Sequence, residues 1–465
     1  MSRLPVACIV VGLLIFSTLA PAAELRRSPY LLEMKPDGVT IRWRTDRSSP
    51  PPALVRYGSD PNKLDRALMA TELPSAANLA YDWTATLTGL KPNTKYYYAL
   101  DMAGVTLCGG DEDCAFITSP AVGEKAPLRF WCLGDSGSNR PRGPNTAASL
   151  KATGPGGPFL IRNGFLKFNG DKPIRGGIIL LGDNGNPQGT DIQYQTAFFQ
   201  TYPRLLSKTA LWPCVGNHDM ERNVYGRTFA TAKDSATSES TNEGPHFPFY
   251  YSADIGNVHL VMLDPWWTWW TRNTDLNHRP WRLQMEWLDK DLAATKQEWI
   301  ILGDHFPCYA DGNYNSDGDN GMLAMLRKEL VPLCDKHGVD MFLAGHDHSY
   351  QRSFLISKHL GDGKTFDPKQ HLKFAGDGRK EPIVKRFGPE GGTIYVVHGA
   401  GGGGRPGGNF ALPAMVPMPE KDGKVLRGIQ GGGSFVIDVD GLTLTSYALD
   451  SAGNVLDQFS MQKQR

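Results

Sequence analysis

The chain has 465 residues, about three times the size of a typical single domain, so two or three domains with sizeable cores are expected. Its 49 lysines and arginines almost balance its 48 aspartates and glutamates. This balance excludes the basic footprint of a nucleic-acid-binding protein, and a small or locally charged ligand is the expected partner.

The first 22 residues have the pattern of an export signal. Arg3 precedes an apolar run from Leu4 to Leu19, and Ala20-Pro21-Ala22 supplies the small-x-small pattern that signal peptidase cleaves. We interpret residues 1–22 as a signal peptide; the alternative is an uncleaved anchor, although a membrane span needs about 20 apolar residues. The mature protein is then expected to be exported, periplasmic or secreted, with no stable membrane span.

Export leaves six cysteines in the mature chain. Cys108 and Cys114 flank a short polar turn, where an oxidising compartment would close them across the end of a hairpin. Cys132 and Cys214 lie in apolar runs, where packed free thiols and a disulfide bond are equally compatible with the sequence.

Residues 28–120 are expected to form an all-β domain. Short runs with alternating polarity are separated by turn residues, and the runs are Val39–Arg44, Ala53–Tyr57, Tyr81–Leu87 and Lys95–Leu100. Such alternation is typical of a small β-sandwich. Residues 120–127 then form a linker.

Residues 127–460 have a different pattern, with apolar strands separated by helical stretches. The apolar runs at 129–133, 177–181, 299–302 and 339–344 are typical of strands buried on both faces. Helices are predicted at 284–295 and 322–337, and closing hairpin strands at 433–439 and 442–448. Two polar segments, 233–245 and 362–390, are predicted to be solvated surface loops.

Five motifs in a fixed order place Asp, Asn or His directly after apolar runs. They are Gly134-Asp135-Ser136-Gly137, Gly182-Asp183-Asn184, Gly216-Asn217-His218-Asp219, Leu302-Gly303-Asp304-His305-Phe306-Pro307 and Gly345-His346-Asp347-His348. A single Gly-Asp pair is usually only a turn. Five strand ends at one sheet edge, however, would supply oxygen and imidazole ligands to two cations, which is the arrangement that hydrolyses phosphate esters.

The order of these motifs, with His305, Pro307 and Tyr309 in the fourth, resembles that of the calcineurin-like metallophosphoesterases. It is most similar to the purple acid phosphatase branch, and the resemblance covers nearly the whole mature chain. It implies a fibronectin-type-III-like sandwich at 28–120, followed by an α/β (α+β) four-layer metallophosphoesterase domain at 127–460.

The resemblance also implies a role for each motif residue. It makes Asp183 the ligand that bridges both metals, Asp135 and His348 ligands of the first metal, and Asn217, His305 and His346 ligands of the second. His218 would face the substrate, where it would stabilise phosphate charge or protonate the leaving oxygen, and Asp219 would fix its tautomer.

The sequence departs from the family pattern at the first metal. The metal-binding Tyr of the second motif is replaced by Asn186, and the alternative His of the first motif is replaced by Gly137. Asn184, Asn186 or water would complete that site, and Fe, Zn and Mn all remain compatible with it.

A second departure concerns the proton donor. No His occurs between Ala310 and Gly321, so the acid is predicted to be His218, Asp317 or Asp319.

Two further features lie near the expected site. Four tryptophans, Trp266, Trp267, Trp269 and Trp270, would either pack internally or form an aromatic wall for a base or aryl group. The run Gly399–Gly404 is not followed by Gly-Lys-Ser/Thr, so it is predicted to be an irregular loop at the site mouth.

These patterns predict an exported binuclear-metal phosphoesterase that hydrolyses small phosphate monoesters with a metal-activated hydroxide. The first alternative is a phosphodiesterase acting on nucleotides or lipid head groups, because the same metal pair serves both reactions. The second is a non-catalytic cell-surface binding protein with a degenerate metal site.

Overall fold

The computed structural model describes residues 23–46, 52–73, 80–137, 157–229, 249–265, 279–318, 321–389, 391–420 and 423–464. The predicted signal peptide, the segment 233–245, the four tryptophans at 266–270 and Asp319 lie outside the described residues. No helix in the described part of the chain is long and apolar enough to span a bilayer.

The described chain contains mostly strands. In chain order they are β1 (Leu25–Lys35), β2 (Gly38–Asp46), β3 (Ala53–Gly58), β4 (Arg66–Met69), β5 (Thr71–Leu73), β6 (Ala80–Leu87), β7 (Lys95–Met102), β8 (Val105–Gly109), β9 (Ala115–Ile117), β10 (Leu128–Leu133), β11 (Gly177–Leu181), β12 (Ala210–Cys214), β13 (Tyr251–Ile255), β14 (Val258–Met262), β15 (Trp299–Asp304), β16 (Met341–Ala344), β17 (Ser349–Arg352), β18 (Ile383–Arg386), β19 (Ile394–His398), β20 (Ile429–Gln430), β21 (Gly433–Asp440), β22 (Thr443–Asp450) and β23 (Val455–Gln464). The helices are α1 (Pro158–Asn169), α2 (Asp191–Gln193), the π-helical η1 (Tyr194–Phe199), α3 (Pro203–Leu206), α4 (Arg222–Phe229), α6 (Arg279–Ala294), α7 (Met322–His337), the 3-10 turn η2 (Gly363–Thr365) and α8 (Pro368–His371).

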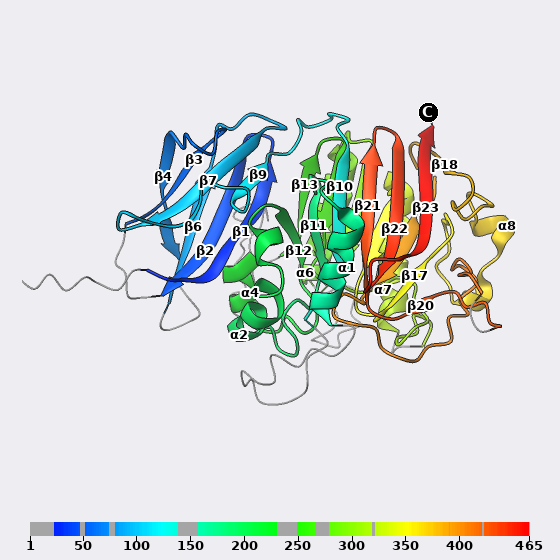
Figure 1. Cartoon of the computed structure of the whole chain (residues 1–465). Helices are drawn as coiled ribbons and strands as arrows, with labels where there is room; N and C mark the ends of the chain where they lie inside the picture. Colours follow the sequence, from blue (N-terminus) through cyan, green and yellow to red (C-terminus); the bar gives the residue numbers. More distant parts are fainter. Residues whose placement is uncertain are drawn as a thin grey trace, which may run out of the picture.

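One sheet joins the N-terminal β-rich part to the rest of the molecule. Its 11 strands follow the order β18-β23-β22-β21-β10-β11-β12-β1-β2-β6-β5, so it runs from one end of the molecule to the other (Figure 1). Strand β1 pairs in parallel with β12, with Leu31 opposite Ala210. The sandwich is completed by a second sheet, β4-β3-β7-β8, with β9 beside β7.

The part of the chain after residue 127 has four layers. A seven-stranded sheet, β13-β14-β15-β16-β19-β17-β20, packs on the large sheet. Helices α1, η1, α3 and α4 share a core with the outer face of the large sheet, and α6 and α7 share one with the seven-stranded sheet. The predicted fold, an all-β sandwich followed by a layered α/β domain, is confirmed.

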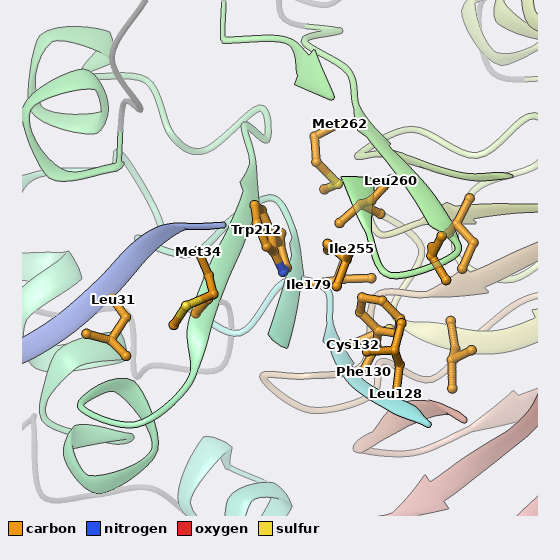
Figure 2. Close-up of a cluster of buried hydrophobic side chains, with 14 of the residues drawn as sticks. Leu31, Met34, Leu128, Phe130, Cys132, Ile179, Trp212, Ile255, Leu260 and Met262 are labelled. Carbon is orange, nitrogen blue, oxygen red and sulfur yellow. The ribbon is translucent and has the colours of Figure 1, made fainter. Parts of the chain in front are cut away.

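The core between the sheets is continuous from the sandwich into the catalytic part. Figure 2 shows Met34 of β1, Trp212 of β12, Ile179 of β11 and Leu260 of β14 in one buried cluster. Burial of each such side chain contributes about 1.5–3 kcal/mol. The large sheet is therefore held to both of its neighbours by one hydrophobic core.

The prediction that 362–390 is a solvated loop is wrong in part, because the segment is largely exposed but also contains regular elements. The segment contains η2, α8 and β18, and β18 pairs in parallel with β23. Lys385 of β18 is buried, with its Nζ 2.7 Å from Oδ1 of Asp340, and burial lowers the pKa of Lys385 to about 8. The strand was not predicted because a lysine occupies one of its buried positions and interrupts the hydrophobic pattern.

All six cysteines of the described chain are free thiols. The Sγ atoms of Cys108 and Cys114 lie 3.5 Å apart, so the expected pair is adjacent but not bonded. Cys132 and Cys214 are buried and unbonded, which confirms the alternative of packed thiols for these two residues.

Candidate metal centre

The five motifs meet where the two catalytic sheets come together. Asp135, Asp183 and Asn217 follow β10, β11 and β12, which are neighbours in the large sheet. His305 follows β15 and His346 follows β16, which are neighbours in the other sheet. Parallel strands place their carboxyl ends at the same edge, which brings the ligand candidates together.

Three buried residues form the centre of the cluster. Asp135, Asp183 and His305 each offer a ligand atom, and these atoms lie within 4.8 Å of one another. His348 joins them with its Nε2 3.2 Å from Oδ1 of Asp135, and the backbone N–H of His346 donates to Oδ2 of the same carboxylate at 2.7 Å.

The protonation of His305 leaves a lone pair directed into the cluster. Its Nδ1 lies 2.8 Å from the carbonyl oxygen of Leu181, which only accepts, so Nδ1 carries the hydrogen. Nε2 then faces Oδ1 of Asn217 at 2.9 Å and Oδ1 of Asp183 at 3.5 Å. Three lone pairs that converge without a hydrogen between them are a donor set for a cation.

Other buried polar atoms support the same fit. Oδ1 of Asp135 and Nδ1 of His348 are buried and have no hydrogen-bond partner among the described residues. Burial lowers the pKa of His348 to about 4, so its imidazole is neutral and able to bind a metal. Burial also raises the pKa of Asp135, a cost that a bound cation would offset. Mixed carboxylate, amide and imidazole ligands suit Fe, Zn and Mn.

Glycines precede the ligands because the strand ends approach too closely for a side chain. A Cβ at Gly216 would lie 2.2 Å from Oδ1 of Asp183, and one at Gly345 would lie 2.5 Å from the carbonyl oxygen of Leu181. The absence of a side chain at these two glycines allows the strand ends to pack closely.

Three ligand candidates themselves have left-handed backbone conformations. The φ angles are +57° for Asp135, +55° for Asp183 and +65° for His346. Such conformations cost about 1–3 kcal/mol each and persist where the surrounding structure imposes them. The fold thus sacrifices local stability to direct these side chains into the cluster.

At the first metal, the two positions that lack a family ligand are in contact. A Cβ at Gly137 would lie 2.8 Å from the backbone N of Asn186, and the N–H of Gly137 donates to the carbonyl of Asp183 at 3.0 Å. The Nδ2 atoms of Asn184 and Asn186 are buried without a hydrogen-bond partner among the described residues.

His218 is the exposed member of the cluster, with 36% of its side chain accessible. Its Nε2 lies 4.0 Å from Oδ2 of Asp183, and its Nδ1 lies 2.9 Å from the carbonyl oxygen of Pro187. Pro187 therefore orients this imidazole, and its carbonyl requires the hydrogen on Nδ1.

The prediction that Asp219 fixes the tautomer of His218 is wrong. Oδ2 of Asp219 accepts from the N–H groups of Asp183 at 2.9 Å and Gly216 at 2.8 Å. Its Oδ1 accepts from the hydroxyl of Tyr194 at 2.8 Å and the N–H of Gly185 at 3.3 Å. Asp219 holds the second and third motifs together and acts on the backbone that carries the ligands.

Asp317 does not serve as the acid in this arrangement. Its Oδ1 accepts from Arg327 at 2.9 Å and its Oδ2 from the N–H of Gly363 at 2.7 Å. Both oxygens are occupied by structural contacts, so of the three acid candidates only His218 is a described residue that faces the cluster.

Sequence reasoning missed Asp347, the variable position of the fifth motif. Its Oδ2 accepts from the N–H groups of Gly312 and Tyr314, each at 3.1 Å. The ring of Tyr314 is thereby stacked on the imidazole of His346, with 3.9 Å between centroids and 24° between planes. A buried Asp between two ligand histidines was the available signal.

Sequence reasoning also missed a charged contact between the sandwich and the second motif. Asp191, at the start of α2, accepts from Arg44 at 2.6 and 2.8 Å and from Arg27 at 3.0 Å. Oε1 of Gln193, two residues on, accepts from the N–H of Gln188 at 3.0 Å. The loop that carries Pro187 is thus tied to strands β1 and β2.

Comparisons with known proteins agree with this site. The family model described as calcineurin-like phosphoesterase matches residues 128–350, and the one described as purple acid phosphatase, N-terminal domain, matches residues 30–114. Purple acid phosphatase 23 of Arabidopsis thaliana is 27% identical over 320 residues, which cover 63% of this chain and 64% of that protein, slightly under two thirds of its length. Tartrate-resistant acid phosphatase type 5 of Sus scrofa is 27% identical over 245 residues, covering 47% of this chain and 68% of that protein.

Two solved structures share the fold. The purple acid phosphatase PPD1 of yellow lupin has a TM-score of 0.61 at 19% identity, covering 94% of this chain and 74% of that one. The structure of PhoD has a TM-score of 0.59 at 13% identity, covering 94% of this chain and 90% of that one.

Residues 128–350 thus match the calcineurin-like phosphoesterases, the class of domain found in metal-dependent phosphoric ester hydrolases. Within that class the chain is a purple acid phosphatase-like member, with Asn186 in place of the metal-binding tyrosine of the second motif.

Proposed function

We propose that the protein is an exported phosphatase that hydrolyses small phosphate monoesters at a binuclear metal centre. The observation that carries the proposal is the position of Asp183. Its carboxylate is buried within 4.8 Å of ligand atoms of Asp135 and His305, and its Oδ1 lies 3.5 Å from the same His305 Nε2 that faces Asn217. A carboxylate placed in this way serves two cations at once.

Each residue then has a defined task. Asp135 and His348 would hold one metal, Asn217, His305 and His346 would hold the other, and Asp183 would contribute to both. Metal ions at these residues would supply the chemistry of an activated hydroxide and of charge neutralisation at the phosphate oxygens. His218, oriented by the carbonyl of Pro187, donates from Nε2 to a phosphate oxygen or to the leaving oxygen. Asp219 keeps the Asp183 backbone in place.

Removal of the bridging carboxylate tests the proposal. Asp183→Asn should lower kcat/KM for an aryl phosphate by more than the ~10–100-fold that is typical when only a ligand's supporting residue is changed. Metal analysis should find two metals per chain in the wild type and fewer in the variant, with an unchanged circular dichroism spectrum. Full activity of D183N would contradict the proposal.

The same assays separate the alternatives. Comparison of a bis-aryl with a mono-aryl phosphate distinguishes a diesterase from a monoesterase, because only a diesterase prefers the bis-aryl ester. Fewer than two metals per wild-type chain, together with no turnover, would favour a non-catalytic binding protein.

We also propose the boundaries and the export of the chain. A signal peptide at 1–22, a sandwich at 28–120 and a catalytic domain at 127–460 are supported by the sequence pattern and by the ranges of the two family matches. The shared large sheet implies that the two domains do not separate. N-terminal sequencing of the exported protein should begin at Ala23.

A further inference from the structure

A cavity of about 350 Å³ lies between the sandwich and the part of the chain after residue 127. Strands β1, β7 and β9 line it from the sandwich. The end of α1, residues 171–175, the end of α3 and the start of β12 line it from the other part. Its volume is at the lower end of the range of about 300–1,000 Å³ in which proteins bind small organic molecules.

The cavity lies at the opposite end of the strands from the candidate metal centre. Arg175 precedes β11 and Ala210 begins β12, whereas Asp183 and Asn217 follow the far ends of the same two strands. A strand of five residues spans about 17 Å, at about 3.3 Å per residue. A small molecule in the cavity therefore does not contact the ligand candidates, and the cavity is a separate site.

Hydrogen bonds between the sandwich and the rest of the chain hold the walls of the cavity. The hydroxyl of Ser207 donates to the carbonyl of Asp113 at 2.6 Å, and the hydroxyl of Tyr98 donates to the carbonyl of Ser207 at 2.8 Å. Arg175, which lines the cavity, donates from Nη1 to Oδ1 of Asn93 at 3.2 Å. The cavity is therefore formed before a ligand binds, which lowers the cost of binding.

Apolar side chains form part of the lining. Met34, Phe116 and Ala210 are buried members of it. Leu166, near the end of α1, also lines the cavity but is 40% exposed. A ligand with an apolar body would remove the Leu166 side chain from water, which favours binding.

Two of the four cationic side chains in the lining already have an anionic partner. Nζ of Lys95 lies 2.7 Å from Oε2 of Glu112, and Nζ of Lys208 lies 3.1 Å from Oδ1 of Asp113. These two pairs carry no net charge, so they do not attract an anion or a cation into the cavity.

The other two cations of the lining, Lys172 and Arg175, outnumber the one remaining carboxylate, Asp171. The ammonium of Lys172 has no hydrogen bond or ion pair with a described residue. Nε of Arg175 is buried without an acceptor, and Nη1 is the one nitrogen of this guanidinium that is bonded to a described residue. Nε and Nη2 form one side of the guanidinium, and a carboxylate matches that side with two parallel hydrogen bonds. The excess of one positive charge favours a monoanion.

We propose that this cavity binds a small organic carboxylate that has an apolar body. Arg175 and Lys172 hold the carboxylate, and the apolar lining around Leu166 holds the body. A single carboxylate matches the excess charge of the lining, and an apolar body matches its uncharged surface. The inference concerns a site other than the metal centre and does not rest on the proposed phosphatase function.

Binding of 2-naphthoate, a bicyclic carboxylate, tests this inference, with the neutral 2-naphthamide as the comparison ligand. Calorimetry at pH 7 measures the affinity of the protein for each. In Arg175→Gln the ratio of the 2-naphthoate to the 2-naphthamide affinity should fall about tenfold, which is about 1.4 kcal/mol. The matched control is Arg386→Gln, an identical change at an exposed position of β18 outside the lining, which should leave the ratio unchanged.

A second pair of variants tests the position of the ligand. Leu166→Glu adds a carboxylate to the lining and should lower the 2-naphthoate affinity about tenfold or more, because like charges repel. Leu160→Glu makes the same change on the same helix, at a residue that is also 40% exposed but does not line the cavity, and should leave the affinity unchanged. Both positions are exposed, so both variants should fold, and circular dichroism checks this.

The outcomes are distinct. Asp183→Asn changes the metal centre and should retain 2-naphthoate binding; loss of binding in D183N would place the carboxylate at the metals and overturn the inference. An unchanged ratio in R175Q, equal effects of L166E and L160E, or no binding of 2-naphthoate by the wild type would overturn it as well. None of these measurements involves turnover, so a lack of phosphatase activity would contradict the proposed function and leave this inference standing.

Discussion

Replacement of Asp191 by asparagine should destabilise the protein strongly, because it removes one of two carboxylates that neutralise two buried arginines. Asp191 accepts from Arg44 at 2.6 and 2.8 Å and from Arg27 at 3.0 Å. The exposed fractions of these side chains are 17% for Asp191, 6% for Arg44 and 2% for Arg27. The change keeps the shape of the side chain and removes only its charge and one acceptor oxygen.

The magnitude follows from the remaining partners. Asp82 stays with Arg44, at 2.7 Å, but Arg27 keeps only the neutral side chain of Gln195, also at 2.7 Å, and the Phe199 ring, 4.1 Å from its guanidinium carbon. Breaking a buried pair by removal of one partner costs about 3–5 kcal/mol. That loss is a large share of the ~5–15 kcal/mol that stabilises a typical protein.

Urea unfolding at pH 7 measures this effect. The matched control is Asp289→Asn, where an exposed carboxylate contacts Lys336 and His337 and the loss should stay within about 1 kcal/mol. The reasoning is refuted if D191N is no less stable than D289N at pH 7.

The pH dependence of the difference gives a second check. Burial acts to raise the pKa of Asp191, but the hydrogen bonds and charges of Arg44 and Arg27 outweigh it and hold the pKa below its usual value. The stabilisation is therefore present above the unfolded pKa of about 4 and is lost as the pH falls through the lower folded pKa. The difference in free energy of unfolding between wild type and D191N should be full at pH 7 and should become smaller in acid. A difference that is constant with pH would show that packing, and not charge, explains the lower stability of D191N.

D191N should also affect catalysis through the loop that carries Pro187. Because the Pro187 carbonyl orients His218, a looser loop should lower kcat more than it changes KM. A variant that is destabilised but has wild-type kcat at a temperature where it is fully folded would separate the stabilising role of Asp191 from this positioning role.

Three further predictions concern groups elsewhere. His259 lies between Asp254 and Asp291. Burial lowers the pKa of His259, but the two carboxylates outweigh burial and raise the pKa to about 9. The contribution of His259 to folding stability is therefore full below the unfolded pKa of about 6.5 and is lost as the pH rises through 9. His259→Gln should cost about 3 kcal/mol at pH 6 and little at pH 10 in urea unfolding. Oxidation should close Cys108 and Cys114 into a disulfide visible in non-reducing peptide maps, because their sulfurs are already 3.5 Å apart. Chelation should lower Tm by several degrees and re-addition of Zn or Mn should restore it, since ligands that bind only the folded state stabilise it.

Each of these has a contrary result. An equal cost of H259Q at both pH values would mean that the ring stabilises by packing and not by charge. A peptide map in which the two cysteines remain separately alkylated after oxidation would show that the hairpin end resists the bond geometry. A Tm unaffected by chelators, in a preparation shown to contain metal, would contradict a centre formed from the core motifs.

The elements predicted correctly from the sequence are those in which the local pattern matched the final environment. Helix α7 begins and ends as predicted at Met322 and His337, where Gly338 with φ of +69° terminates it. Strand β11 was found because its five residues are apolar and buried on both faces. Strand β18 was missed because Lys385 points into the core, where its Nζ contacts Asp340 and donates to the carbonyls of Gly338 and Val339.

In the candidate site, too, some features were predictable from the sequence and others were not. The candidate ligands were predicted from the motifs and the family resemblance, and the structure brings Asp135, Asp183 and His305 together at the ends of β10, β11 and β15. The roles of Asp219, Asp347 and Asp191 could not be predicted, since each acts on a partner more than 20 residues away in sequence or in a neighbouring loop. Side-chain direction at a strand end depends on what packs above it, and a single sequence does not contain that information.

The two positions that depart from the family pattern at the first metal lie against each other in the structure. Gly137 and Asn186 belong to different motifs, yet a Cβ at Gly137 would lie only 2.8 Å from the backbone N of Asn186 and from the carbonyl oxygen of Asn184. A histidine at position 137 would therefore displace the backbone that carries Asp183, to which Gly137 donates at 3.0 Å. Because the first motif cannot supply a further ligand, the loop of the second motif or solvent would have to complete the ligand set of the first metal site. Asn184 and Asn186 place two buried amide groups without hydrogen-bond partners among the described residues in that loop, and these amides or solvent would take the place of the missing tyrosine.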